Sequence, residues 1–148
     1  MSDTTTTPGI EITRRFDAPR ELVFRAWTTP ASFAHWFGGT EAEVPVESVV
    51  MDVRVGGRWS AVMYAGPDRQ EIPWKGVYRE VVEPERLVFT LTDQPDDSDE
   101  AITVELADVD GGTVMTFIQS GGNLPIEQYA AAKAGWEHFF EVMAGMLA

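Results

Sequence analysis

Residues Ile126–Leu147, IEQYAAAKAGWEHFFEVMAGML, carry the strongest structural signal in the sequence. They lie near the end of a chain of 148 residues, which is about the size of one domain. Their large apolar side chains recur at helical spacing and form a wide stripe made of Trp136, Phe139, Phe140, Val142, Met143, Met146 and Leu147. The sequence therefore predicts a long C-terminal helix that buries one face against the rest of the chain.

The remaining chain has the pattern of an antiparallel sheet. Residues 10–16 alternate apolar and polar side chains, and proline then starts two short helices, at 19–28 and from residue 30 onward. Six more strand-like stretches follow, at residues 44–54, 57–64, 71–82, 86–93, 101–108 and 112–120. Short turns join these stretches, and such turns permit only antiparallel pairing. We predict an α+β fold in which a curved antiparallel sheet of about six or seven strands wraps around the long C-terminal helix, with two short helices after the first strand.

Composition excludes several classes of function. The chain has no cysteine, which excludes disulfides, thiolate zinc sites, iron–sulfur clusters and cysteine nucleophiles. Its net charge of −13 disfavours binding to nucleic acid or to anionic membranes through a general basic surface. No apolar run approaches the roughly 20 residues of a membrane span. Because the lack of cysteine also fits a reducing compartment, we expect a cytoplasmic protein.

The polar segments indicate where the domain begins and where it is interrupted. Residues 1–9 are polar and rich in threonine, which predicts a disordered tail before a single domain at 10–148. Five acidic residues within 93–100 predict a solvated loop, and Gly121-Gly122 predicts a hinge before the last helix.

Several short motifs occur in a recognisable order. They are RFDAP at 15–19, VFRAWT at 23–28, FAHWF at 33–37, DVRVGGRW at 52–59, PERLVFT at 84–90, and Gly135-Trp136 in the last helix. Together they resemble the START-like or Bet-v-1-like (SRPBCC) superfamily, in particular the group named after the C-terminal domain of the activator of the 90-kDa heat-shock chaperone's ATPase. The resemblance covers about residues 10–148. It implies a helix-grip fold with a cavity between helix and sheet, and no shared chemistry, because members include lipid and hormone carriers, polyketide cyclases and chaperone regulators.

Strand parity and the five tryptophans indicate which residues would line such a cavity. The small residues Ala61 and Gly76 would leave room between larger neighbours. The predicted lining comprises Trp36, Trp59, Ala61, Met63, Trp74, Gly76, Tyr78, Phe89, Met115, Phe117, Gln119, Trp136, Phe140 and Met143. The alternative is that these residues pack into a filled core, which is the commoner role of any single buried tryptophan.

Three polar residues are candidates for the cavity. His35 is either an acid or base at the cavity mouth or a surface histidine, and we favour the surface. Glu80 either points inward, orienting a polar ligand group or meeting Arg58, or is an exposed charge, and we favour exposure. Tyr64 is the third candidate. We expect the second histidine, His138, to face solvent.

The sequence offers no catalytic constellation. No nucleophile motif and no phosphate-binding glycine loop occurs. Two histidines on separate helices, without cysteine, do not make a zinc site. We therefore predict no catalytic residue, no metal and no cofactor.

Three hypotheses for function follow. The leading one is a non-catalytic domain that binds a small, unidentified hydrophobic molecule in an apolar, aromatic-lined cavity. The second is a cyclase-like or hydrolase-like enzyme that uses cavity polar groups. The third is a regulatory module with a chaperone as its partner, which would show a contiguous exposed apolar patch.

Overall fold

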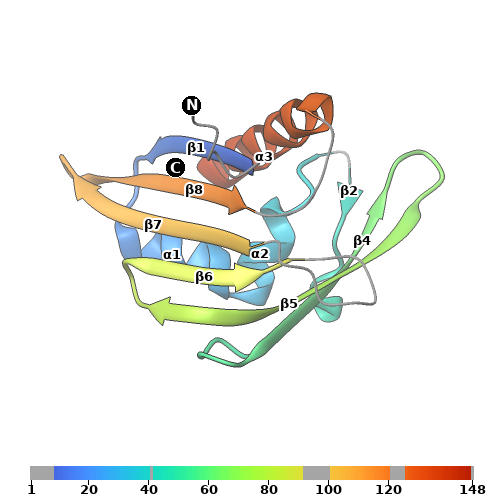
Figure 1. Cartoon of the computed structure of the whole chain (residues 1–148), viewed down its shortest axis with the longest axis horizontal. Helices are drawn as coiled ribbons and strands as arrows, with labels where there is room; N and C mark the ends of the chain where they lie inside the picture. Colours follow the sequence, from blue (N-terminus) through green and yellow to red (C-terminus); the bar gives the residue numbers. More distant parts are fainter. Residues whose placement is uncertain (1–8, 41, 92–100, 121–125, 148) are drawn as a thin grey trace, which may run out of the picture.

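The computed structural model describes residues 9–40, 42–91, 101–120 and 126–147 (Figure 1). The elements are β1 (Gly9–Phe16), α1 (Arg20–Thr28), α2 (Pro30–Trp36), β2 (Ala42–Glu43), the 3-10 helix η1 (Val46–Ser48), β3 (Val50–Met51), β4 (Arg58–Ala65), β5 (Gln70–Val82), β6 (Arg86–Thr90), β7 (Ala101–Val109), β8 (Gly112–Ser120) and α3 (Ile126–Leu147). Of the predicted tail at 1–9, residues 1–8 lie outside the described residues, and Gly9 is instead the first residue of β1. The acidic loop and the Gly121-Gly122 hinge also lie outside the described residues.

The strands form one antiparallel sheet in the order β1-β8-β7-β6-β5-β4-β2, with β3 also paired to β4. The helices α1 and α2 lie against one face of this sheet, and α3 runs beside β1 on the same side (Figure 1). The predicted α+β helix-grip fold is confirmed. No helix in the described part of the chain is both long and apolar enough to cross a membrane.

The strand predicted at residues 44–54 is wrong. The structure instead has two-residue strands on either side of η1. Pro45 precedes η1 and has no N–H for a strand ladder. The Ser48 hydroxyl donates to the Pro45 carbonyl at 2.7 Å, and its oxygen accepts from the Val62 N–H at 3.1 Å. Between the pairs that β2 and β3 make with β4, the Ser48 side chain thus supplies the bond to Val62 of β4 that a regular strand backbone would have given.

The chain breaks between α1 and α2 because of Pro30. The carbonyl of Ala26 would ordinarily accept from the N–H four residues later, but that residue is Pro30, which has none. The indole N–H of Trp36 donates to this carbonyl instead, at 2.7 Å. The last turn of α1 is therefore completed by a side chain of α2.

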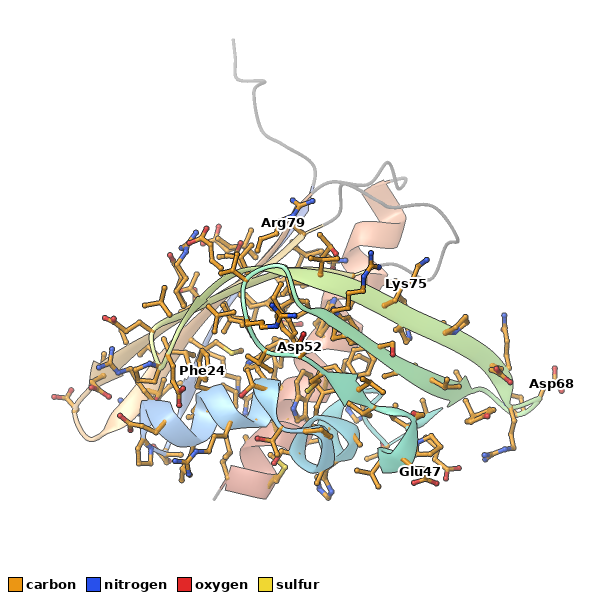
Figure 2. All side chains as sticks on the ribbon, turned by 90° about the horizontal axis from the view of Figure 1, so that it is seen from below. Phe24, Glu47, Asp52, Asp68, Lys75 and Arg79 are labelled. Carbon is orange, nitrogen blue, oxygen red and sulfur yellow. The ribbon has the colours of Figure 1, made fainter. Side chains whose placement is uncertain are left out.

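Strand β5 is shared by two parts of the sheet. Its first half pairs with β4, from Gln70 to Val77, and its second half pairs with β6 from Tyr78 onward. The register of β5 against β6 shifts just after Tyr78. Toward the turn that joins them, β4 and the first half of β5 continue as an arm that extends past the end of β6 (Figure 1). Lys75 and Arg79 lie on the face of β5 that points away from the helices (Figure 2).

The junction of β4, β5 and β6 is closed by two hydrogen bonds to one residue. The hydroxyl oxygen of Thr90 accepts from the Val77 N–H at 2.9 Å. The carbonyl of Thr90 accepts from the indole N–H of Trp59 at 2.9 Å. We call these three residues, together with Gly76, the β4–β5–β6 junction.

Candidate functional site

Most of the aromatic residues gather between the sheet and the helices. We call this group the aromatic cluster, and its members are Trp27, Phe33, Trp36, Phe37, Trp59, Trp74, Tyr78, Phe89, Phe117, Trp136, Phe139 and Phe140. Neighbouring rings lie with centroids 4.5–6.4 Å apart, mostly edge-to-face or tilted. These are the distances and orientations that aromatic quadrupoles favour.

Three of the five tryptophans have hydrogen-bonded indoles. Trp36 and Trp59 donate to the backbone carbonyls described above. Trp136 donates to the side-chain oxygen of Gln119 at 3.0 Å. These indoles meet the usual rule that a buried polar atom has a partner.

The other two tryptophans do not meet this rule. The indole nitrogens of Trp27 and Trp74 are buried and have no hydrogen-bond partner among the described residues. The third such nitrogen is Nε of Arg20, which lies 3.1 Å from a carboxylate oxygen of Asp108 and so belongs to an ion pair. The two indoles are therefore the unexplained polar groups of the core.

Trp27 lies at the centre of the aromatic cluster. It is 2% exposed and comes from the buried face of α1. Its ring stacks on Phe117 of β8, and it also contacts Trp136 and Phe140 of α3 and Phe89 of β6. One indole thus contacts both walls, the sheet and the last helix.

Trp74 lies on the arm of β4 and β5, beyond the junction. Its ring is 6.2 Å from that of Phe37, at the end of α2. Phe37 in turn contacts Trp136 and Phe139 of α3. The two unpaired indoles are therefore linked by rings of α2 and α3.

A contact between α3 and the loop after α2 closes one side of the cluster. The Nε2 atom of His138 accepts from the backbone N–H of Thr40 at 3.2 Å and lies 3.0 Å from the Thr40 hydroxyl. Gly39, with φ +67°, lies so close that a Cβ there would be 2.4 Å from the His138 ring. Because the Thr40 amide can only donate, Nε2 is the acceptor of this bond. His138, expected to face solvent, is half-buried and hydrogen-bonded to Thr40.

Most of the predicted lining residues are buried side by side. Trp136, Phe140 and Met143 are the inward residues of α3. The buried members of the predicted set are Trp36, Trp59, Ala61, Met63, Tyr78, Phe89, Met115, Phe117, Trp136, Phe140 and Met143, and the half-buried ones are Trp74, Gly76 and Gln119. That these residues line an open cavity stays a prediction.

The interpretation of Gly76 needs correction. It was expected to leave space, but a Cβ at Gly76 would be 1.7 Å from the Thr90 carbonyl oxygen and 2.4 Å from the Trp59 indole nitrogen. The absent side chain makes room for the Trp59–Thr90 hydrogen bond, and that bond fills the space. Glycine is required here by the junction rather than by a ligand.

The three candidate polar residues lie away from the aromatic cluster. His35 is exposed. Tyr64 is half-buried and lies under the guanidinium of Arg69, 5.2 Å from the ring centroid. Glu80 is exposed and pairs with Arg86 at 3.0 Å, so the inward interpretation of Glu80, with Arg58 as a partner, is wrong.

Tyr78 is the titratable member of the cluster. Burial raises the pKa of its hydroxyl, and the nearby carboxylate of Asp52 raises this pKa further. The hydroxyl therefore stays protonated and can donate a hydrogen bond. Outside the cluster, Arg14 hydrogen-bonds Glu141 at 2.6 Å and lowers the pKa of that carboxyl.

Sequence reasoning missed part of the cluster. Trp27, Phe33, Phe37 and Phe139 were not among the predicted lining residues, although all four contact residues that were. The signal was present, because Trp27 shares the apolar face of α1 with Val23. The described residues contain no group of three or more histidine or acidic side chains that could hold a metal ion.

The comparisons with known proteins agree with this architecture. The sequence model of the family described as activator of Hsp90 ATPase homolog 1-like protein matches residues 17–148. The chain belongs to this family. None of the curated proteins matches it.

Solved structures of similar proteins share the fold of this activator-like chain. Protein CV1439 from Chromobacterium violaceum is 27% identical, with a TM-score of 0.83 over 94% of this chain and 96% of that one. The AHSA1 protein from Silicibacter pomeroyi is 21% identical, with a TM-score of 0.78 over 95% and 97%. The AHSA1-like protein from Aeromonas hydrophila is 23% identical, with a TM-score of 0.76 over 95% and 96%. The predicted START-like resemblance is confirmed.

Proposed function

We propose that this protein binds a small hydrophobic molecule within the aromatic cluster, without catalysing a reaction on it. The observation that carries the proposal is the indole N–H of Trp27, which is buried among aromatic rings and has no partner among the described residues. Leaving such a donor unpaired costs about 1–3 kcal/mol. A bound molecule that contributes an acceptor would offset this cost. The unpaired donor therefore favours a binding role for the cluster in addition to its packing role.

The surroundings of Trp27 suit an apolar guest. Aromatic side chains supply large contact areas to ligands, and a few polar groups fix the orientation of a ligand. Membership of a helix-grip family is consistent with this role but does not by itself specify it. As the cysteine-free composition suggests, we expect the protein to act in the cytoplasm.

The enzyme hypothesis has less support. A catalytic cavity would need polar groups such as His35, Tyr64, Tyr78 or Gln119, but His35 and Tyr64 lie outside the cluster, and Gln119 accepts from Trp136. Tyr78 is inside, but burial raises the pKa of its hydroxyl, which makes it a poor general base.

The test uses the purified chain with a set of lipids and aromatic metabolites. Native mass spectrometry should show a one-to-one adduct, and the same molecule should quench tryptophan fluorescence. The variant Phe117→Leu, which removes a ring stacked on Trp27, should weaken binding. The matched variant Leu22→Ala, at an exposed position on α1, should not. Absence of any adduct, or equal binding by both variants, would contradict the proposal.

A chaperone-regulating module is the second candidate, because the family name refers to an Hsp90 ATPase activator. Val50 of β3, which pairs with β4, is 61% exposed, and two more exposed valines, at positions 46 and 55, lie near it in the sequence. A pull-down from the cell's own extract with the wild type and with Val50→Ser tests this candidate. Retention of a chaperone by the wild type but not by the variant would support this candidate, and no retention would remove it.

A further inference from the structure

The unpaired indoles narrow the chemistry of the ligand. We infer that the molecule bound in the aromatic cluster is electrically neutral and carries a hydrogen-bond-accepting oxygen, such as a ketone, that receives the N–H of Trp27. This inference rests on the proposed function. It adds the class of ligand, which neither the family nor the fold specifies.

The direction of the hydrogen bond follows from the indole. An indole nitrogen can donate but cannot accept. The ligand atom facing Trp27 must therefore have a lone pair. The buried indole nitrogen of Trp74, on the other side of Phe37, also lacks a partner among the described residues and also requires an acceptor. A pure hydrocarbon would leave both donors unsatisfied.

We infer that the ligand is uncharged from the other polar groups of the described core. Besides the indoles and the Tyr78 hydroxyl, none of which carries a positive charge, its buried polar side chains are Thr90 and Thr113. The Thr90 hydroxyl is bonded at the junction, and the Thr113 hydroxyl donates to the Ala18 carbonyl at 2.6 Å. No buried cation is available among the described residues to neutralise a carboxylate or a phosphate, and the chain itself carries a net charge of −13. Burying an unpaired ionic group is expensive, so an anion would be rejected.

A cation is disfavoured for a different reason. Aromatic rings attract cations through their faces, and an acidic protein would add to this attraction. However, the N–H group of Trp27 presents its positive end within the cluster and needs a lone pair, which a quaternary ammonium group lacks. A neutral acceptor satisfies both the rings and the N–H.

The experiment compares three probes built on one tricyclic ring system by isothermal titration calorimetry. They are 9-fluorenone, fluorene and fluorene-9-carboxylate, which offer a neutral acceptor, no acceptor and a charged acceptor. We expect fluorenone to bind about three- to tenfold more tightly than fluorene, and the carboxylate to bind more weakly than both. Trp27→Phe should abolish the preference for fluorenone over fluorene, whereas Trp136→Phe, at an indole already paired with Gln119, should retain it.

A measurement on the wild-type protein tests the inference even if the variants fail to fold. A nitrogen-15 correlation spectrum should contain one indole N–H signal for each of the five tryptophans. Fluorenone should move the Trp27 proton downfield, as a new hydrogen bond does, and leave the bonded indoles of Trp36 and Trp59 almost unmoved. Fluorene should not move the Trp27 signal in this direction.

The outcomes separate the two proposals. If none of the probes binds and the metabolite screen is also negative, the proposed function fails. If the probes bind with equal affinity, or the carboxylate binds best, the cluster binds ligands but the inference about their class is overturned. If fluorenone binds best without a downfield shift at Trp27, its oxygen is received elsewhere and the inference is again overturned.

Discussion

Trp59 and Trp27 are both 2% exposed, yet their indoles are in opposite situations. Trp59 donates to Thr90 at the β4–β5–β6 junction, where glycine at position 76 leaves space for the bond. Trp27, in the middle of the aromatic cluster, has no partner among the described residues. At the junction the indole donor is thus satisfied within the fold, whereas in the cluster the indole donor of Trp27 has no partner among the described residues. Burial alone therefore does not distinguish a packed indole from one that can bind a ligand, whereas the presence or absence of a hydrogen-bond partner does.

The largest expected effect is at the junction. Gly76→Ala would place a Cβ against the Thr90 carbonyl, which is backbone and cannot move aside cheaply. We expect a loss of about 3 kcal/mol or more in the free energy of unfolding, measured by urea denaturation. The control is Gly135→Ala in α3, where a Cβ meets nothing within 4 Å. This change should be neutral or stabilise by about 0.5–1 kcal/mol. Equal effects at both glycines would show that the junction is not tightly packed.

The comparison itself is tested by matched tryptophan substitutions. Trp59→Phe removes ring area and leaves the Thr90 carbonyl without the indole donor, whereas Trp27→Phe removes ring area together with an unpaired donor. We therefore expect Trp59→Phe to destabilise the ligand-free protein by about 1–2 kcal/mol more than Trp27→Phe. Thermal and urea unfolding would measure this difference. If Trp27→Phe proves the more costly, its N–H has a structural role after all.

A smaller effect should follow from the threonine at the junction. Thr90→Val keeps the shape of the side chain but removes the oxygen that accepts from Val77. The expected loss is about 1 kcal/mol in the free energy of unfolding, because a half-buried N–H loses its partner. Thr103→Val, at a half-buried position on β7, is the control and should change stability by less than about 0.5 kcal/mol. Amide exchange at Val77 should accelerate in Thr90→Val alone.

The smallest effect should come from the contact that closes one side of the cluster. His138→Ala removes the acceptor of the Thr40 amide at a partly exposed position. We expect a loss of about 0.5–1 kcal/mol. A double-mutant cycle with Thr40→Ala would isolate the part due to the two side chains. Strict additivity in this cycle would show that the hydroxyl of Thr40 does not contribute.

The fold was predictable because its signals are periodic. The stripe of α3, the alternation of β4 and β8 and the turns between strands agree with one another, and all favour an antiparallel sheet against a long helix. The prediction failed at residues 44–54, where β-rich composition outweighed Pro45. There the Ser48 side chain bonds to β4 between the two short strands, and periodicity carries no information about such a bond.

The candidate site was predictable only in part. Strand parity placed Trp59, Met63 and Phe117 correctly among the buried residues. It could not reveal that Gly76 accommodates a hydrogen bond instead of a cavity, because this depends on where β5 leaves β6. Nor could it separate paired from unpaired indoles, since the partners of Trp36, Trp59 and Trp136 are distant along the chain or belong to the backbone.

The bond from Trp36 to the Ala26 carbonyl has a consequence for folding. Helices of nine and seven residues are too short to persist alone in water, where about 12–15 residues are needed. The last turn of α1 gains its final hydrogen bond only when α2 has docked and brought Trp36 into place. The two helices should therefore form and open as one cooperative unit, with matching amide-exchange rates at the end of α1 and in the last turn of α2.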